Sequence, residues 1–481
     1  MDADGNKNVR DDARTLIVIS DLHIGAGALD DFDVPIELEF TVFIGDISQR
    51  AAPVELVING DFLEFVQAIP WEDAALRSVT PEGQQLCFTQ TQSVAKLESI
   101  IRHHPNVFKA LGWFLAKPAN RLVILPGNHD ADLFWPDVRA RLRAILDETA
   151  GGPVGDRLVL HLDRVYRPPQ MPGVWIEHGH QYDTNNRFYF DDGECWSDAK
   201  PPIVQIDGTG RLLACVGTQF LCDYLNKLDE THPFVDNVKP FSKFVKMFLV
   251  GSALFRFGTP VRAAIAAWGI LRFLATLRQQ SLGALLSEGG RDVPSVAEAV
   301  RDAWKELPEP QQDAFVNALE CRGIEFVMPI PDLLSHEASA AAVLDSMAEN
   351  FDLVVAFFPP PPEGLLSIEG GDGTLGFVVD FVADESKALR EAAENLLRHA
   401  GAKVVIMGHT HEPQDHPAGL NYINTGSWTR YLRVAEQQVE PSSWSLLAPG
   451  AIEHFPYRLL FAEIVAAAPD SVRLNEWKAG S

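Results

Sequence analysis

Short apolar runs that each end in a polar, chemically capable residue place the strongest constraint on the fold of this chain. They are Leu16 to Ser20 before Asp21, Leu56 to Asn59 before Asp61, Leu122 to Leu125 before Asn128, Val174 to Ile176 before His178, and Val404 to Met407 before His409. Runs of this length and composition are typical of buried strands. Helical patterns lie between them, at Thr91 to Leu115, Trp135 to Leu146 and Ser386 to His399. The alternation predicts α/β layers, with the polar side chains gathered on the loops of one sheet edge.

Composition places the chain among folded proteins of a reducing compartment. It has 481 residues, of which 46% are hydrophobic and 22% are charged, and this length predicts two or three compact units. The N-terminus is polar and acidic, unlike a secretory signal. The five cysteines are scattered without a C-x-x-C pair: Cys87, Cys195, Cys215, Cys222 and Cys321. We therefore expect free thiols and a cytoplasmic location.

The formal charge of −26 restricts the partners of the chain. Most of the surface should repel a polyanion, so non-specific binding of nucleic acid would need a local basic patch. The charge is compatible with a small phosphorylated substrate. Nucleic acid is therefore not the expected partner, and the oligomeric state stays open.

The strand and helix rhythm breaks after residue 195 and resumes near residue 386, which predicts a core split by an insertion. We expect core at 1–195 and 386–481, with a mainly helical insertion at 196–385. Within it, 237–287 has no acidic residue but seven basic ones: Lys239, Lys243, Lys246, Arg256, Arg262, Arg272 and Arg278. The longest apolar stretches of this segment are far shorter than the roughly 18 residues that cross a bilayer.

Two interpretations of 237–287 remain open. The segment could be a helical hairpin whose apolar side packs on the core. Alternatively, it could form a basic amphipathic surface that contacts anionic lipid, peripheral to the inner face of a membrane, or covers a substrate with acyl chains.

The polar residues at the strand ends form sets that suit metal ions. In chain order these are Asp21-Leu22-His23, Gly60-Asp61, Gly127-Asn128-His129-Asp130, His178-Gly179 and Gly408-His409-Thr410-His411. Carboxylate, imidazole and amide donors together suit Mn, Fe or Zn better than Ca or Mg. In an extended strand end, residues i and i+2 point the same way, so Asp21 and His23 could both face one ion, and His409 and His411 could both face the sheet edge. Two ions about 4 Å apart need a shared anionic ligand, and Asp61 suits that position.

These motifs, in this order and each after an apolar strand, resemble those of the calcineurin-like metallophosphoesterase superfamily. The resemblance covers about 14–195 and 386–465. It implies a four-layer αββα sandwich and an enzyme that hydrolyses a phosphomonoester, phosphodiester or pyrophosphate by metal-activated hydroxide. The cofactors implied are two divalent ions, with manganese favoured and iron or zinc as alternatives.

The resemblance also implies a role for each motif residue. One ion is held by Asp21, His23 and His411, and the other by Asn128, His178 and His409, with Asp61 bridging the two. His129 is then the catalytic histidine that is not a ligand, and Asp130 its orienting partner. His180 competes with His178 for the ligand position, but the family ligand directly precedes a glycine, as His178 does.

Two subgroups of this superfamily can be compared with the chain. Protein serine/threonine phosphatases carry an arginine soon after the bridging aspartate, whereas this chain reads Gly60-Asp61-Phe62-Leu63-Glu64-Phe65. The UDP-2,3-diacylglucosamine hydrolases share the S-D-L-H opening and a basic, apolar insertion. They differ in having arginine at the position of His129, H-G-D in place of His178-Gly179-His180, and a shorter lid. A nucleotide-linked or lipid-linked substrate thus rests on analogy.

Two other function classes stay open, a nuclease of the same fold and a non-catalytic, membrane-associated scaffold that keeps its metals.

Several further polar residues have a functional and a structural interpretation. Tyr182, Asp183 and Asn186 could line the substrate side or cap a turn, and Asn424, Thr425 and Ser427 should help to close the site. His103 and His104 are expected to be exposed, with no role as ligands.

Overall fold

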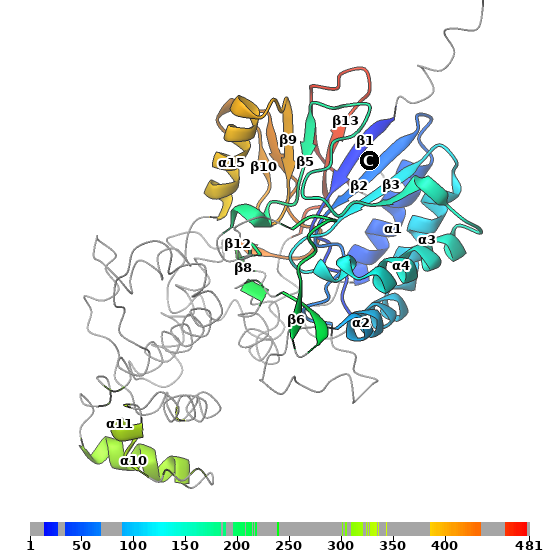
Figure 1. Cartoon of the computed structure of the whole chain (residues 1–481). Coiled ribbons are helices and arrows are strands. Elements are labelled where there is room, and N and C mark those ends of the chain that lie inside the picture. Colours follow the sequence, from blue (N-terminus) through cyan, green and yellow to red (C-terminus); the bar gives the residue numbers. More distant parts are fainter. Residues whose placement is uncertain are drawn as a thin grey trace, which may run out of the picture.

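The structure of the chain is a computed structural model. It describes residues 14–26, 34–68, 89–183, 186–188, 196–206, 208–213, 215, 217–218, 238–239, 301, 304, 309–320, 324, 326, 328–333, 335, 343, 385–433 and 457–478. The arrangement of these residues is that of an α/β protein with two main sheets (Figure 1).

The larger sheet has six strands in the order β14-β13-β1-β2-β3-β4. The four parallel strands are β1 (Thr15–Ile19), β2 (Val54–Asn59), β3 (Arg121–Leu125) and β4 (Leu158–Leu160). The antiparallel edge consists of β13 (Leu460–Ile464) and β14 (Arg473–Glu476). Every residue of β1 and β2 is buried, as expected for strands covered on both faces. The three predicted strands before Asp21, Asp61 and Asn128 are confirmed.

Four helices lie on one face of this sheet (Figure 1). They are α1 (Val34–Ser48), α2 (Gln90–His103), α3 (Pro105–Ala116) and α4 (Pro136–Thr149). A cluster of buried residues joins them to the sheet, with Phe40 and Phe43 packing on the ring of Trp428 at centroid distances of 5.7 and 4.9 Å. This layer of helices covers one face of the parallel strands.

The helix predicted at Thr91 to Leu115 is two helices, broken at His104. Pro105 has no N–H to donate, and it disfavours helical geometry in the residue before it. The break turns His104 inward, so the predicted exposure of this residue is wrong. Its side chain is 4% exposed and its Nδ1 lies 2.9 Å from the Glu37 carboxylate of α1. His103 is exposed as predicted.

The smaller sheet has the order β10-β11-β9-β5. Its strands are β10 (Gln414–Asp415), β11 (Tyr422–Asn424), β9 (Val404–Met407) and β5 (Val174–Ile176), which confirms the two remaining predicted strands. Helix α15 (Glu385–His399) packs on its outer side through Leu389 and Ala393 (Figure 1). One apolar cluster contains residues of both sheets, among them Val18 and Ile406. The sheets therefore share a core made from segments far apart in sequence.

The remaining described elements are short. They are β6 (Ile203–Ile206) paired with β7 (Thr209–Leu212), β8 (Val238–Lys239) paired with β12 (Leu432–Arg433), α10 (Glu309–Glu320), α11 (Ile330–Leu333), and the 3-10 turns η1 (Ala131–Phe134), η2 (Gly155–Arg157), η3 (His180–Tyr182) and η6 (Pro417–Gly419). The basic, apolar segment 237–287 lies outside the described residues, apart from 238–239. Its two interpretations, and the division into core and insertion, stay predictions. Among the helices that the structure describes, none combines the length and apolarity needed to cross a bilayer.

Trp428 provides a test of the helix and sheet core. Its indole is fully buried, and its Nε1 donates to the Leu460 carbonyl at 2.7 Å. We expect Trp428→Ala to lower the free energy of unfolding by about 3–5 kcal/mol, because it removes a large apolar side chain and leaves a cavity. Urea denaturation followed by circular dichroism measures this loss. The control is Trp113→Ala, at a tryptophan that is 66% exposed, which should change stability by less than about 0.5 kcal/mol.

Candidate metal centre

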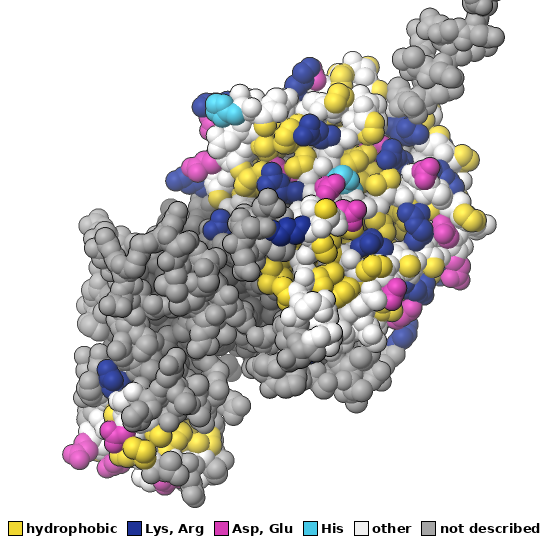
Figure 2. Space-filling model, viewed as in Figure 1, with side chains coloured by type: hydrophobic (Ala, Val, Ile, Leu, Met, Phe, Trp, Pro, Cys, Tyr) yellow, Lys and Arg dark blue, Asp and Glu magenta, His cyan; other side chains and the backbone are white. Residues whose placement is uncertain are grey.

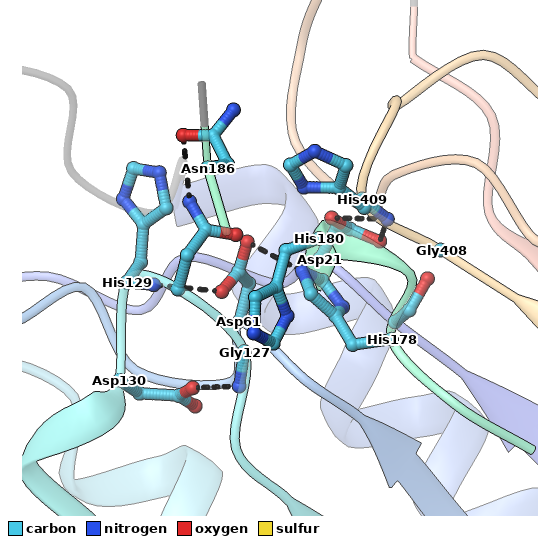
Figure 3. A network of polar contacts seen from close by, with 12 residues as sticks. Asp21, Asp61, Gly127, His129, Asp130, His178, His180, Asn186, Gly408 and His409 are labelled. Atoms are coloured by element: carbon cyan, nitrogen blue, oxygen red, sulfur yellow. Dashed lines mark hydrogen bonds and ion pairs between the residues drawn. The ribbon is translucent and has the colours of Figure 1, made fainter. Parts of the chain in front are cut away.

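The polar residues that follow the strands of both sheets meet in one place (Figure 3). Asp21, Asp61 and Asn128 follow the parallel strands β1, β2 and β3, and His178 and His409 follow β5 and β9. All five residues are buried, with Asp21 fully so. The predicted gathering of these side chains at one end of the strands is confirmed.

The backbone at these strand ends is left-handed rather than extended. The φ angle is 55° at Asp21, 47° at His23, 50° at Asp61, 73° at His409 and 57° at His411. Non-glycine residues rarely adopt this conformation, which costs on the order of 1–3 kcal/mol each and concentrates at functional sites. The expected extended geometry of the D-x-H and H-x-H pairs is therefore wrong. With this backbone, Asp21 and His23 still come together in one cluster of donors, whereas His409 and His411 take part in different clusters.

Two glycines allow this close approach. A Cβ atom on Gly127 would lie 2.1 Å from Asp61 Oδ1, and one on Gly408 would lie 2.4 Å from Asp21 Oδ2. Both contacts are far too short for real atoms, so any side chain at either position would displace a carboxylate of the centre.

Three overlapping groups of side chains have donor atoms close enough to hold a metal ion. They are Asp21, His23 and His411; Asp61, His178 and His409; and His23, Asp61 and His129, with all donor atoms of each group within 4.8 Å of one another. The first two groups agree with the two sets of ligands that the sequence motifs led us to expect. Asp61 takes part in two groups, so the centre could hold one or two ions. Their chemical identity is unknown.

Asn128 adds an amide oxygen to this set. Its Oδ1 atom is buried and has no hydrogen-bond partner among the described residues, whereas its Nδ2 donates to Asn186 Oδ1 at 3.4 Å. Leaving a buried acceptor unpaired costs about 1–3 kcal/mol. A cation that accepts this oxygen as a ligand would remove the cost, so the amide fits a metal centre.

The charges of the centre are strongly coupled. Burial raises the pKa of Asp21, and the neighbouring Asp61 carboxylate raises it further. Burial opposes ionisation of Asp61 as well, but His178, His129 and His23 outweigh it and hold the pKa of Asp61 well below its usual range. The same attraction overcomes the burial of His178 and raises the pKa of that imidazole to about 9. The two carboxylates thus require positive charge beside them, which either protonated histidines or metal ions can supply.

Glu64 is a buried carboxylate of the centre that the sequence analysis did not single out. Its Oε2 lies 2.8 Å from His23 Nδ1 and 2.7 Å from His129 Nδ1, while its Oε1 accepts from the amides of Val66 and Gln67. Burial would raise the pKa of Glu64, but the two imidazoles lower it to about 2. The sequence signal was an acidic residue inside the apolar run Phe62-Leu63-Glu64-Phe65, where only a paired carboxylate is tolerated.

Asp130 was the expected partner of His129, and the structure places it differently. Its carboxylate points away from that imidazole and accepts from the amide of Gly127 at 2.5 Å (Figure 3). It also accepts from the amides of Phe62 and Leu63 at 2.9 and 3.3 Å. Burial, with the charge of Asp61, raises the pKa of Asp130 to about 7. The carboxylate that contacts His129 is Glu64, and Asp130 instead ties together the loops that follow β2 and β3.

Asp183 and Asn186 connect two of the expected ligands. Asp183 Oδ2 lies 3.0 Å from His409 Nε2 and accepts from Asn186 Nδ2 at 2.6 Å. Asn186 Oδ1 in turn accepts from Asn128. A carboxylate on the far nitrogen of a metal-binding histidine sets its tautomer and ring orientation. Of the three residues grouped in the sequence, Tyr182 differs, because its hydroxyl donates to Glu177 at 3.0 Å.

Several neighbours hold the loops of the centre. Ser427 donates to the Asp21 carbonyl at 2.9 Å, Asn424 donates to the Gly408 carbonyl at 2.7 Å, and the Thr425 hydroxyl lies 2.6 Å from that of Ser20. These contacts agree with the expectation that the three residues close the site.

His180 is in none of the metal-binding groups found among the described residues. Its ring packs on Trp196 at 4.4 Å and its Nε2 lies 2.7 Å from Gln181 Nε2.

No protein-family model and no curated protein matches this chain. By its own geometry, the chain is an α/β protein in which buried histidines and aspartates could hold one or two metal ions.

The position of Asp61 in two groups can be tested by metal analysis. We expect Asp61→Asn to weaken both ions together, by more than the roughly 10- to 100-fold that loss of an outer partner costs, because both groups lose charge at once. Elemental analysis after equilibrium dialysis against Mn²⁺ measures the stoichiometry. His103→Ala, at an exposed histidine, is the control and should leave it unchanged. Loss of a single ion in Asp61→Asn would contradict a shared ligand.

The contact of Asp183 with His409 predicts a more selective effect. Asp183→Asn should weaken one of the two ions by roughly 10- to 100-fold and spare the other, since His409 belongs to only one group. The same dialysis experiment resolves the two affinities. Equal weakening of both ions, or of neither, would show that the carboxylate does not act through His409.

Proposed function

We propose that this chain is a dinuclear metal-dependent phosphoesterase of the calcineurin-like type, built as a four-layer αββα sandwich. The observation that carries the proposal is that Asp61 shares one metal-binding group with His178 and His409 and another with His23 and His129, so it lies between donors of both expected ligand sets. A shared carboxylate is what two closely spaced cations need. The order of the strand-end motifs along the chain supports the same conclusion.

In this proposal Asp21, His23 and His411 hold one ion, and Asn128, His178 and His409 hold the other, with Asp61 between them. When bound, the ions would supply Lewis acidity, lowering the pKa of water and neutralising phosphoryl oxygens. The unpaired Oδ1 of Asn128 and the three overlapping groups fit this assignment. The metal pair is proposed from donor chemistry alone, which favours Mn, Fe or Zn over Ca and Mg.

His129 is proposed to act as the general acid, and Glu64 to orient it. A carboxylate that is ionised throughout the neutral range, at 2.7 Å from Nδ1, holds the Nδ1 proton on the ring. That leaves Nε2 as the nitrogen from which a proton can pass to a leaving alkoxide or phosphate. The amide of His129 also donates to Asp61 Oδ1 at 2.9 Å, which fixes its backbone beside the shared ligand.

The proposed substrate is a small phosphoester or pyrophosphate. A net charge of −26 opposes the approach of long polyanions more than that of a single phosphoryl group, which weighs against the nuclease alternative. We also propose a lipid-linked substrate and peripheral membrane contact. Both rest only on the basic charge and apolar composition of 237–287.

Turnover of a phosphoester panel tests the proposal. Protein loaded with Mn²⁺ should hydrolyse at least one of bis-p-nitrophenyl phosphate, p-nitrophenyl phosphate and a nucleoside diphosphate analogue. His129→Ala should keep both ions yet lose roughly 10²- to 10⁴-fold in kcat, as for a missing general acid. The matched control His416→Ala removes a half-exposed histidine that directly follows β10 and should retain full activity.

The outcomes separate the alternatives. Loss of metal in His129→Ala would make His129 a ligand, as its membership of the third group allows. Metal binding without hydrolysis of any panel member would favour the scaffold alternative, and cleavage of single-stranded DNA at low salt would favour the nuclease.

A further inference from the structure

A cavity lined in part by arginines lies at the end of the larger sheet opposite the metal centre. It has a volume of about 630 Å³, and its lining includes Arg14, Arg121, Asp156, Arg157 and Gln170. Ligand pockets commonly measure about 300–1,000 Å³, so this cavity has room for a phosphorylated small molecule. Three arginines on one cavity make it a candidate anion site.

Strand direction separates this cavity from the metal centre. Arg14 directly precedes β1 and Arg121 is the first residue of β3, whereas Asp21 and Asn128 follow the same strands. A strand rises about 3.3 Å per residue, so the five residues of β1 place the two ends roughly 17 Å apart. No ligand of ordinary size could occupy both sites.

Two of the arginines are held in place by backbone carbonyls. The Nε of Arg14 donates to the Ala119 carbonyl at 3.1 Å. The Nε of Arg157 donates to the Val154 carbonyl at 3.1 Å, and its Nη1 donates to the Leu115 carbonyl. A carbonyl orients a guanidinium without neutralising its charge. Less side-chain entropy is then lost when an anion binds.

Arg121 is the third arginine and donates no hydrogen bond within the described part of the chain. Its Nε atom is buried without a partner, and the nearest carboxylate oxygen, Glu55 Oε2, is 3.9 Å away. Glu55 is itself engaged, because its oxygens accept from Tyr166 at 2.9 Å and from Gln170 at 3.4 Å. A guanidinium carries five donors, and leaving the buried Nε–H of Arg121 without a partner is costly.

The charges around the cavity leave a positive excess. Three guanidinium groups meet the two carboxylates of Asp156 and Glu55, in a chain whose net charge is −26. On the face drawn in Figure 2, basic and acidic side chains of the described residues are interspersed, so the overall charge does not forbid a local basic site. Forked guanidinium donors match the oxygens of a phosphate better than those of any neutral ligand.

We propose that this cavity binds a small phosphate-bearing anion at a site separate from the metal centre. Arg121 supplies the unused donors, and Arg14 and Arg157 supply charge from fixed positions. Because no metal-binding group of the described residues includes any residue of the cavity, the bound phosphate would not be hydrolysed there. The site would let a phosphorylated metabolite bind the protein without being consumed.

Binding of inorganic pyrophosphate to the full chain tests this proposal. The titration is made calorimetrically in the presence of a chelator, so that metal ions do not hold the anion in the other centre. We expect one saturable site, weakened roughly tenfold or more in Arg121→Gln, as for the loss of a charged hydrogen-bond donor. Arg121→Lys keeps the charge but loses the fork and should bind with intermediate affinity. Arg473→Gln, at an exposed arginine of β14, is the matched control.

A second variant distinguishes the two sites. Pyrophosphate binding should persist in Asp61→Asn, which alters only the metal centre. If binding is lost in Asp61→Asn but kept in folded Arg121→Gln, the anion occupies the metal centre and the proposal is wrong. Absence of saturable binding in the unaltered chain would also overturn it. Neither result would bear on the phosphoesterase proposal, which is measured with metal present and by turnover.

Discussion

The centre depends on two carboxylates, Asp21 and Asp61, that are buried at the ends of neighbouring strands. Burial of both charges is unfavourable unless positive charge lies within a few ångströms. The histidines around them meet this requirement, and they do so with the atoms that would bind cations. The left-handed turns and the two tightly packed glycines then follow as consequences, because they are what allows the donors to approach this closely.

Two further carboxylates contact these histidines and restrict their orientation. Glu64 contacts both His23 and His129, and Asp183 contacts His409. Each of these acids is buried and tied to other groups, so the imidazoles have few alternative orientations. Glu64 has an additional consequence, since one oxygen couples an expected ligand to the expected acid. A substitution of either histidine should therefore alter the environment of the other.

The parallel sheet gives the molecule two chemically different ends. Its strands end in acidic and imidazole donors, and they begin beside arginines. Between these ends, β1 and β2 are buried along their whole length, and one apolar cluster joins the two sheets. Such a close-packed core keeps the two ends at a fixed separation.

The five strands and the clustering of Asp21, Asp61, Asn128, His178 and His409 were predictable from sequence alone, because apolar runs and the polar residues that end them are local patterns. Only the tertiary structure decided the rest. The break at Pro105 buried His104 through a contact with a different helix, and the turns at the strand ends replaced the expected extended geometry. The contact of His129 with Glu64, and not with Asp130, likewise depended on how the loops after β2 and β3 pack together. Contacts across many residues have no signature in local periodicity, so partners of this kind appear only once the chain is folded.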